Sequence, residues 1–167
     1  LLASMADIFV SDAPPDSHRP YATIVGIAKL LPSYAGLLLC DEVNHLSAAR
    51  MPESPSFAIL GGAKFETKAP LIKLLLEKYD HLFIAGALAN DVLRARGFPI
   101  GRSLISKEIP GEDVLAHPHL LVPIDVTVEC ADGQVRVKKP EEIGEEDKIV
   151  DIGPDSVALV APFIAQA

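Results

Sequence analysis

Short apolar runs alternate with amphipathic segments through the second half of the chain. The runs have the length of buried strands, and the segments between them carry apolar residues at spacings of three and four, as helices do. We predict strands at residues 57–60, 81–84, 120–122 and 148–152, and helices at about 67–79, 88–96, 110–116 and after 155. This order predicts an α/β fold with a parallel sheet that is covered by helices on both faces.

The first third of the chain follows a different pattern. Residues 8–10 are typical of a short buried strand, and 11–20 form a polar segment in which three prolines exclude regular structure. Apolar residues at helical spacing predict a helix over 31–49 that begins at Pro32. The polar, proline-containing stretch 50–56 then indicates a domain boundary.

Two features interrupt the alternation of strands and helices near the end. The apolar segments 126–130 and 135–137 flank an Asp-Gly pair, which is a hairpin signal. The acidic run 141–147 is expected to be a solvated loop. Asp155 is expected to cap the last helix, because aspartate is a preferred residue at helix starts.

The Gly-Gly turn after the strand at 57–60 is the strongest candidate for chemistry. Glycine permits a close backbone approach by a ligand, and a helix N-terminus presents free N–H groups to anions. Lys64 and Lys68 are four residues apart, so they lie on one side of the helix start. Together these features indicate a phosphate site. The alternative from spacing alone is a plain strand-to-helix turn with solvated lysines, because short glycine motifs often occur by chance.

Composition and charge narrow the classes of function. The 167 residues carry 23 acidic and 15 basic side chains, a net charge of −8, which argues against a nucleic-acid surface. Two cysteines without metal spacing favour a reducing compartment, and we expect a cytoplasmic protein. The apolar runs are shorter than a membrane span, so no membrane association is expected. The chain opens without Met in a helical pattern, and we expect it to be a piece of a longer protein.

Five motifs, in order along the chain, resemble those of phosphoglycerate kinase. Residues 57–64 with Lys68 resemble the nucleotide-phosphate loop of that family. The other four resemble its substrate loop, the start of its interdomain helix and two segments of its nucleotide domain: Asp12-Ala13 with His18-Arg19; Val25-Gly26 with Leu31-Pro32-Ser33 and Ala35-Gly36; Ile100-Gly101-Arg102-Ser103-Leu104; and Asp151-Ile152-Gly153-Pro154. Their order over nearly the whole chain makes the resemblance specific.

The resemblance implies a fold, an activity and a division of the chain. The family catalyses reversible phosphoryl transfer between 1,3-bisphosphoglycerate and ADP in glycolysis, giving 3-phosphoglycerate and ATP, by closing two domains over the substrates. Residues 1–30 would belong to the N-terminal, phosphoglycerate-binding domain and 31–49 to the interdomain helix. Residues 50–167 would form a C-terminally incomplete nucleotide-binding domain with a Rossmann-like, three-layer parallel sheet. The chain alone is expected to be inactive, and the full-length protein is expected to be a monomer.

The resemblance also implies roles for individual residues. Arg19 matches an arginine that grips phosphoglycerate. Lys64 matches a lysine of the closed catalytic state, and Lys68 matches the lysine that holds the nucleotide and the transferring phosphate. The other implied positions lie against the adenosine, through backbone or apolar side chains: Gly62, Ala63, Gly86, Leu104 and Val150. Mg²⁺ is implied as the cofactor that comes with ATP or ADP, and no protein ligand for it is identified in this chain.

Four departures from the family pattern fall at the expected site. Pro14-Pro15 replaces an aromatic-glycine pair, and Ser11 replaces the Asn that precedes the Asp12-Ala13 motif. Ala85-Gly86-Ala87 replaces a triple glycine, and Thr67 replaces an Asp before the second lysine. The two added methyl groups would crowd a base that presses on this backbone. Both lysines and Arg19 are kept, so we expect an active enzyme. The alternative is a non-catalytic module that binds adenine nucleotide or serves in interaction.

Two further features have open alternatives. His117 and His119 could form half of a metal site, but no third ligand of suitable spacing is evident and a loop is favoured. Asp125 follows a buried strand and could either order the ligand site or stabilise a turn.

Overall fold

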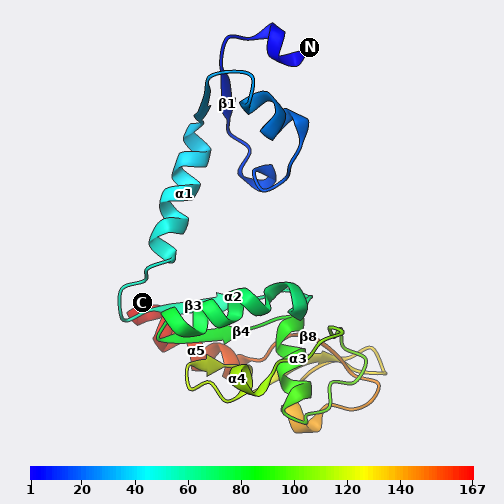
Figure 1. Ribbon diagram of the computed structural model, residues 1–167. Coiled ribbons are helices and arrows are strands. Elements are labelled where there is room, and N and C mark those ends of the chain that lie inside the picture. Colours follow the sequence, from blue (N-terminus) through cyan, green and yellow to red (C-terminus); the bar gives the residue numbers. More distant parts are fainter. The chain divides into compact units, whose positions relative to one another are not determined.

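The computed structural model describes residues 1–167 and divides them into two compact units, Leu1–Met51 and Pro52–Ala167 (Figure 1). None of its helices combines the length and the apolar character that crossing a membrane requires.

The first unit is built on a two-stranded parallel sheet. Strands β1 (Phe9–Ser11) and β2 (Ser33–Ala35) pair with Phe9 opposite Ser33. The helical elements of this unit are η1 (Leu2–Met5), η2 (Pro14–Asp16), η3 (Ala22–Gly26) and α1 (Leu37–Ala49). The prediction that residues 11–20 lack regular structure is therefore wrong at η2. Proline is compatible with the first position of a helical turn, where its missing N–H is not needed.

Helix α1 begins at Leu37 and not at Pro32 as predicted. The Pro32 carbonyl accepts a hydrogen bond from strand β1, and residues 33–35 pair with that strand, so their backbone groups serve the sheet. Asp12, at the end of β1, accepts a hydrogen bond from the backbone N–H of Leu39 (2.8 Å). The helix is therefore capped by a carboxylate from another element, which local sequence does not reveal.

The second unit contains a three-stranded parallel sheet with the strand order β3-β4-β5. Its elements follow along the chain as β3 (Phe57–Leu60), α2 (Phe65–Lys78), β4 (His81–Ile84), α3 (Ala87–Ala95), α4 (Glu112–Leu115) and β5 (Leu120–Leu121). Phe57 lies opposite His81 in the first pair of strands, and Leu82 lies opposite Leu120 in the second. Each of these elements is within two residues of its predicted bounds, because the apolar pattern marks buried strands and amphipathic helices directly.

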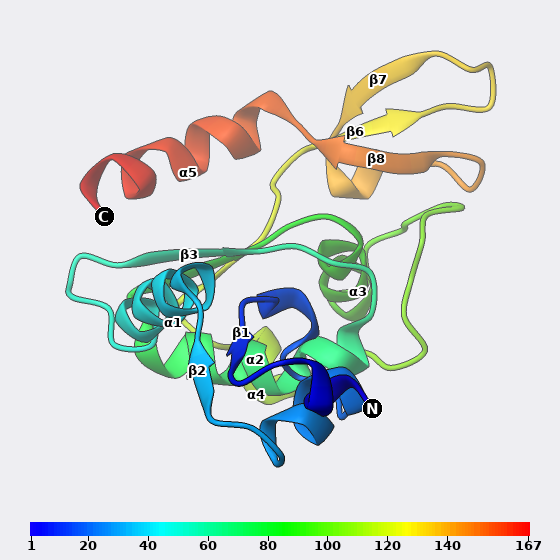
Figure 2. The same cartoon turned by 90° about the horizontal axis from the view of Figure 1, so that it is seen from above.

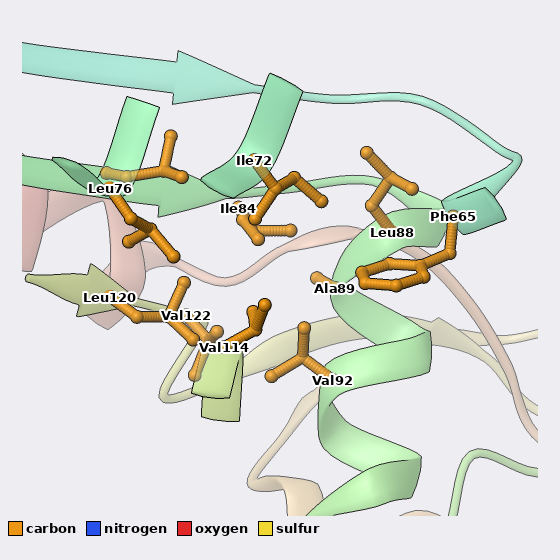
Figure 3. Close-up of a cluster of buried hydrophobic side chains, with 11 residues drawn as sticks. Phe65, Ile72, Leu76, Ile84, Leu88, Ala89, Val92, Val114, Leu120 and Val122 are labelled. Atoms are coloured by element: carbon orange, nitrogen blue, oxygen red, sulfur yellow. The ribbon is translucent and has the colours of Figure 1, made fainter. Parts of the chain in front are cut away.

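Helices cover both faces of this sheet, which confirms the predicted α/β fold. Ala58 and Leu60 of β3 pack against the buried cluster to which α2 contributes, whereas the ring of Phe57 stacks on Phe163 of helix α5 (Pro154–Gln166) with centroids 5.6 Å apart. Figure 2 shows α2 and α5 on opposite sides of β3. The main buried cluster, on the α2 side, is entirely apolar (Figure 3) and consists of Phe65, Ile72, Leu76, Leu82, Ile84, Leu88, Ala89, Val92, Val114, Leu120 and Val122.

The last part of the unit forms an antiparallel sheet, which the alternation of strands and helices along the sequence did not predict. Strands β6 (Val126–Glu129), β7 (Val135–Lys138) and β8 (Lys148–Ile152) pair in the order β7-β6-β8. The predicted hairpin forms and turns β7 back along β6, and β8 then takes the other edge of β6. A second apolar cluster fills this region and contains Leu93, Val126, Val128, Cys130 and Ile143.

Helix α5 is capped by Asp125, not by Asp155 as predicted. The buried carboxylate of Asp125 accepts hydrogen bonds from the N–H groups of Asp155 (2.9 Å) and Ser156 (2.7 Å), and from Ser156 Oγ (2.6 Å). Burial favours a raised pKa for Asp125, but these hydrogen bonds outweigh burial and hold the pKa below its usual range. Of the two roles left open for Asp125, these contacts support the stabilisation of a turn.

The acidic run is not a solvated loop throughout, so that prediction is also wrong. Ile143 is buried, and Asp147 is only 4% exposed. Asp147 Oδ2 accepts hydrogen bonds from Lys138 Nζ (2.6 Å) and from the N–H of Gly144 (2.7 Å). The Lys138 ammonium, with Gly144, lowers the pKa of Asp147 to about 2. The loop that follows η4 (Pro140–Glu142) is thereby tied to β7.

The Lys138–Asp147 pair predicts an acid dependence of stability. Because the pKa of Asp147 is lowered by folding, its contribution is complete above about pH 4 and is lost as the pH falls towards about 2. We expect Asp147→Asn to lower the melting temperature by several degrees at neutral pH, and the difference from the unmodified chain to shrink over that acid range. Thermal denaturation followed by circular dichroism measures it.

Glu145→Gln is the matched control, because it removes an exposed acidic charge from the same loop. We expect it to change the melting temperature little at any pH. A difference between Asp147→Asn and the unmodified chain that does not depend on pH would contradict the role given to this pair.

Candidate functional site

The turn between β3 and α2 carries two unpaired cations. Gly61, Gly62 and Ala63 are exposed at this turn, Lys64 is exposed, and Lys68 is half-buried. Neither lysine forms an ion pair. Lys68 Cε lies 3.9 Å from the position that a Cβ on Gly62 would take, so the lysine stem lies over the glycine turn. Two free ammonium groups beside the positive end of a helix are suited to bind an anion.

A second glycine turn lies beside the first. Gly86, between β4 and α3, has φ +62° and ψ −151°, a backbone region that is essentially restricted to glycine. The N–H of Leu88 donates to the Gly62 carbonyl (3.1 Å), and the N–H of Ala85 donates to the Leu60 carbonyl (2.9 Å). Because β3 and β4 are parallel neighbours, both turns lie at the carboxyl edge of the sheet, where open α/β sheets bind ligands.

A cleft of about 320 Å³ opens beside the second turn, between α3 and β8. Figure 1 shows these two elements next to one another. The wall is mainly apolar and includes Gly86, Leu104 and Val150, three of the residues expected to lie against a nucleoside. Lys148 and Asp151 are its exposed charged members. A volume of this size falls at the lower end of the range for small-molecule sites.

A β-bulge brings Val150 to this cleft. The pairing of β8 with β6 shifts between Thr127 and Val128, which lie opposite Asp151 and Ile149, so Val150 falls between the paired positions. Bulges next to functional sites often re-aim a side chain in this way. Val150 is 49% exposed and Leu104 is 58% exposed. Both apolar side chains are therefore available to pack against a flat, apolar group.

Two buried polar residues of α3, neither of which was predicted from the sequence, join the cleft to the lysine turn. Asn90 Nδ2 donates to the Leu104 carbonyl (2.9 Å). Asp91 accepts hydrogen bonds from Ser106 N (2.8 Å) and Ser106 Oγ (2.6 Å), and Ser106 Oγ in turn accepts one from the N–H of Phe65 (2.8 Å). A signal was present, because a charged residue inside an apolar helical pattern needs a buried partner.

Arg19 belongs to the first unit. Its Nε forms an ion pair with Asp16 (3.2 Å), and its Nη1 donates a hydrogen bond to the Tyr21 hydroxyl (2.8 Å). Of the other expected site residues, Gly62, Ala63 and the two lysines gather at the first turn of the second unit. Gly86, Leu104 and Val150 gather at the cleft.

His117 and His119 make hydrogen bonds within the second unit. His117 Nδ1 accepts a hydrogen bond from the N–H of His119 (3.3 Å), and His119 Nδ1 lies 3.1 Å from the Tyr79 carbonyl oxygen. No three or more His, Cys, Asp or Glu side chains of this chain are arranged to hold a metal ion.

In the comparison with known sequences, the family model and the curated relatives agree on one family. The family model described as phosphoglycerate kinase matches residues 1–167. A phosphoglycerate kinase of Francisella philomiragia is 38% identical over 178 residues, which cover 99% of this chain and 45% of that protein. One from Baumannia cicadellinicola is 38% identical over 170 residues, which cover 99% of this chain and 44% of that protein. The chain thus spans less than half the length of these curated relatives.

Comparison with solved structures agrees. The structure of phosphoglycerate kinase from Coxiella burnetii matches 99% of this chain and 46% of that chain, with a TM-score of 0.78 and 35% identity. The enzyme from Pyrococcus horikoshii matches 95% of this chain and 43% of that chain, with a TM-score of 0.81 and 26% identity.

The backbone conformation of Gly86 predicts that an alanine at this position destabilises the protein. A side chain at φ +62° and ψ −151° is strained, so we expect Gly86→Ala to lower the free energy of unfolding by about 1–3 kcal/mol. Urea denaturation measures it. Gly61→Ala is the matched control in the neighbouring turn, because Gly61 has no positive φ and its added Cβ would meet only the Ala85 carbonyl oxygen at 3.9 Å. Equal stability of the two variants would contradict the prediction.

Proposed function

The chain belongs to the phosphoglycerate kinase family, and on this premise we propose that the whole protein catalyses reversible phosphoryl transfer between 1,3-bisphosphoglycerate and ADP. The products are 3-phosphoglycerate and ATP, and the reaction is a step of glycolysis. One observation about the residues carries the proposal. Lys64 and Lys68, which form no ion pair, lie beside an apolar cleft at one edge of the parallel sheet.

To catalyse phosphoryl transfer, a protein must position the two substrates and supply positive charge, and it needs no covalent nucleophile of its own. In the proposed arrangement the base lies in the cleft, against Leu104 and Val150, and the phosphates extend towards Lys64 and Lys68. The lysine charges oppose the negative charge that is spread over the transferring group. Exclusion of water on domain closure would strengthen each of these contacts, because the local dielectric falls.

The individual roles proposed for this chain follow the same division. The backbone at Gly62, Ala63 and Gly86 lies against the adenosine. Lys68 holds the nucleotide and the transferring phosphate, and Lys64 acts in the closed state. Arg19 grips the phosphoglycerate. Mg²⁺ arrives with the nucleotide, and the chain contributes positive charge and shape, with no protein ligand for the ion identified.

The polar lining of the cleft is compatible with a purine. Asn90 Oδ1 is a buried acceptor without a hydrogen-bond partner, and purines with an amino group carry a suitable donor. Ala85 and Ala87 flank Gly86, and Ala87 lines the cleft. We propose that the base is accommodated in spite of their methyl groups, because the wall of the cleft also includes Leu104 and Val150, against which a base can pack. We also propose that the whole enzyme is cytoplasmic and monomeric.

A second candidate function applies to the chain by itself. The chain covers 45% of a relative such as the one from Francisella philomiragia, and its second unit contains both the lysine turn and the cleft. The isolated chain is therefore proposed to bind adenine nucleotide without catalysing transfer.

Titration of the 167-residue chain with Mg-ADP tests the nucleotide site. We expect calorimetry to detect binding, because the lysine turn and the cleft lie in one unit, and we expect a coupled kinase assay of the same sample to detect no turnover. Absence of binding would contradict the nucleotide site. Turnover by the isolated chain would instead overturn its assignment as a non-catalytic module.

Substitution of Lys68 tests the proposed chemistry. In the whole enzyme we expect Lys68→Ala to lower kcat/KM about 100-fold or more, because one charge that stabilises the transferring phosphate is lost. The melting temperature should change little, since Lys68 forms no ion pair. Lys78→Ala is the control, because it removes one exposed positive charge from the other end of the same helix. Near-normal turnover by the Lys68→Ala enzyme would remove Lys68 from the site.

A further inference from the structure

Helix α2 receives its N-terminal cap from a distant residue. Lys64 occupies the position before the helix, and its side chain makes no capping hydrogen bond. The first N–H of the helix, that of Phe65, donates instead to Ser106 Oγ (2.8 Å). Both Phe65 and Ser106 are buried. The backbone that immediately follows Lys64 is therefore fixed by a contact from a segment far along the chain.

The hydroxyl of Ser106 has a defined direction. It carries one proton and can accept two hydrogen bonds. Asp91 Oδ2 lies 2.6 Å away and the Ala63 carbonyl 3.4 Å away, so the proton goes to the carboxylate and a lone pair remains for Phe65. Asp91 Oδ1 accepts the N–H of Ser106 (2.8 Å). Because both carboxylate oxygens bind the same residue, Ser106 cannot rotate or shift alone.

Helix α3 holds this segment at a second point as well. Asn90 donates to the carbonyl of Leu104, a residue of the cleft wall, and Asp91 holds Ser106, the cap of α2. Arg94 Nη2 donates to the carbonyl of Ser106 (3.3 Å). One turn of α3 therefore sets the distance between the apolar cleft and the lysine turn.

We propose that Asp91 and Ser106 are positioning residues for the nucleotide site. They hold the turn from Lys64 to Lys68 at a fixed place relative to the cleft, so that a base in the cleft brings its phosphates to both ammonium groups. Neither residue touches the nucleotide in this arrangement. The proposal rests on the proposed function, and it adds the residues on which the geometry of the phosphate contacts depends.

The test compares a ligand that has phosphates with one that lacks them. Ser106→Ala frees the N–H of Phe65 and loosens the lysine turn, while the bond from Asn90 to Leu104 stays. By calorimetry we expect the Kd of Mg-ADP to rise about tenfold, and the Kd of adenosine to change by less than about twofold. A general loss of structure would weaken both ligands together.

Ser103→Ala is the matched control. Ser103 is buried, lies three residues earlier in the same segment, and its Oγ accepts a hydrogen bond of 2.8 Å from the N–H of Ile149. It has no link to α2. We expect Ser103→Ala to leave the ratio of the two Kd values unchanged, whether or not it alters the cleft.

A double substitution distinguishes a positioning role of Ser106 from a general effect on stability. If Ser106 acts through the lysine turn, Ser106→Ala should weaken Mg-ADP binding much less in a Lys68→Ala background than in the unmodified chain. Asp91→Asn provides a second variant should Ser106→Ala fail to fold, since it keeps the size of the side chain but replaces the oxygen that accepts the Ser106 proton with an amide nitrogen, and it also removes the charge that faces Arg94 (3.9 Å). It should shift the same ratio in the same direction.

The outcomes distinguish a failure of the positioning role from a failure of the nucleotide site. If the unmodified chain binds both ligands but the ratio of Kd values is unaltered in Ser106→Ala and Asp91→Asn, the positioning role is overturned and the proposed function stands. An equal loss of both ligands also overturns it. If the unmodified chain binds neither ligand, the proposed nucleotide site fails and the positioning role fails with it.

Discussion

The carboxylate of Asp91 has no exposure to solvent, and both of its oxygens are bound by Ser106. A buried carboxylate that loses its partners is strongly destabilising, so the segment that contains Ser106 cannot leave helix α3. Ser106 also accepts the first N–H of α2. The strand-to-helix turn, the cleft wall at Leu104 and helix α3 consequently keep one relative arrangement, and the candidate site of the second unit depends on this contact.

The charge of the whole chain and the charge of the candidate site have opposite signs. A net charge of −8 repels anions at long range, and at physiological ionic strength this repulsion fades beyond a Debye length of about 8 Å. In the proposed site, a phosphate group would therefore be recognised only at short range, by Lys64 and Lys68 and by the first turn of α2. The selectivity of such a site would come from the position of the two ammonium groups, and this is the reason for proposing a role for the buried contacts beneath them.

The apolar pattern of the sequence was sufficient to predict the strands and helices of the parallel sheet. A buried strand or a buried helix face produces a recognisable spacing of apolar residues within a short stretch of sequence. Three errors share one cause. The start of α1, the cap of α5 and the buried end of the acidic run are each set by an aspartate paired with a group elsewhere in the chain: Asp12 with Leu39, Asp125 with Ser156, and Asp147 with Lys138. A local pattern shows that a helix end needs a cap, but it does not show which distant carboxylate supplies it.

The candidate site could also be predicted only in part from the sequence. Spacing made the Gly-Gly turn and its two lysines a candidate phosphate site, with a plain strand-to-helix turn as the alternative, whereas Leu104 and Val150 were identified only through the family resemblance. Their meeting in one cleft depends on the register of β8 against β6 and on the bulge at Val150. Asn90, Asp91 and Ser106 were missed, since the partner of a buried polar residue is decided by tertiary packing.

Helix α3 contributes to both apolar clusters of the second unit. Leu88 and Val92 pack into the cluster of the parallel sheet, and Leu93 packs into that of the antiparallel sheet. The helix cannot unfold without opening both clusters, so the two sheets behave as one cooperative element even though no strand joins them. We therefore expect the part of the cleft wall that α3 supplies to exchange its backbone hydrogens slowly. A ligand would meet a surface that is already ordered, and little conformational entropy would be lost there on binding.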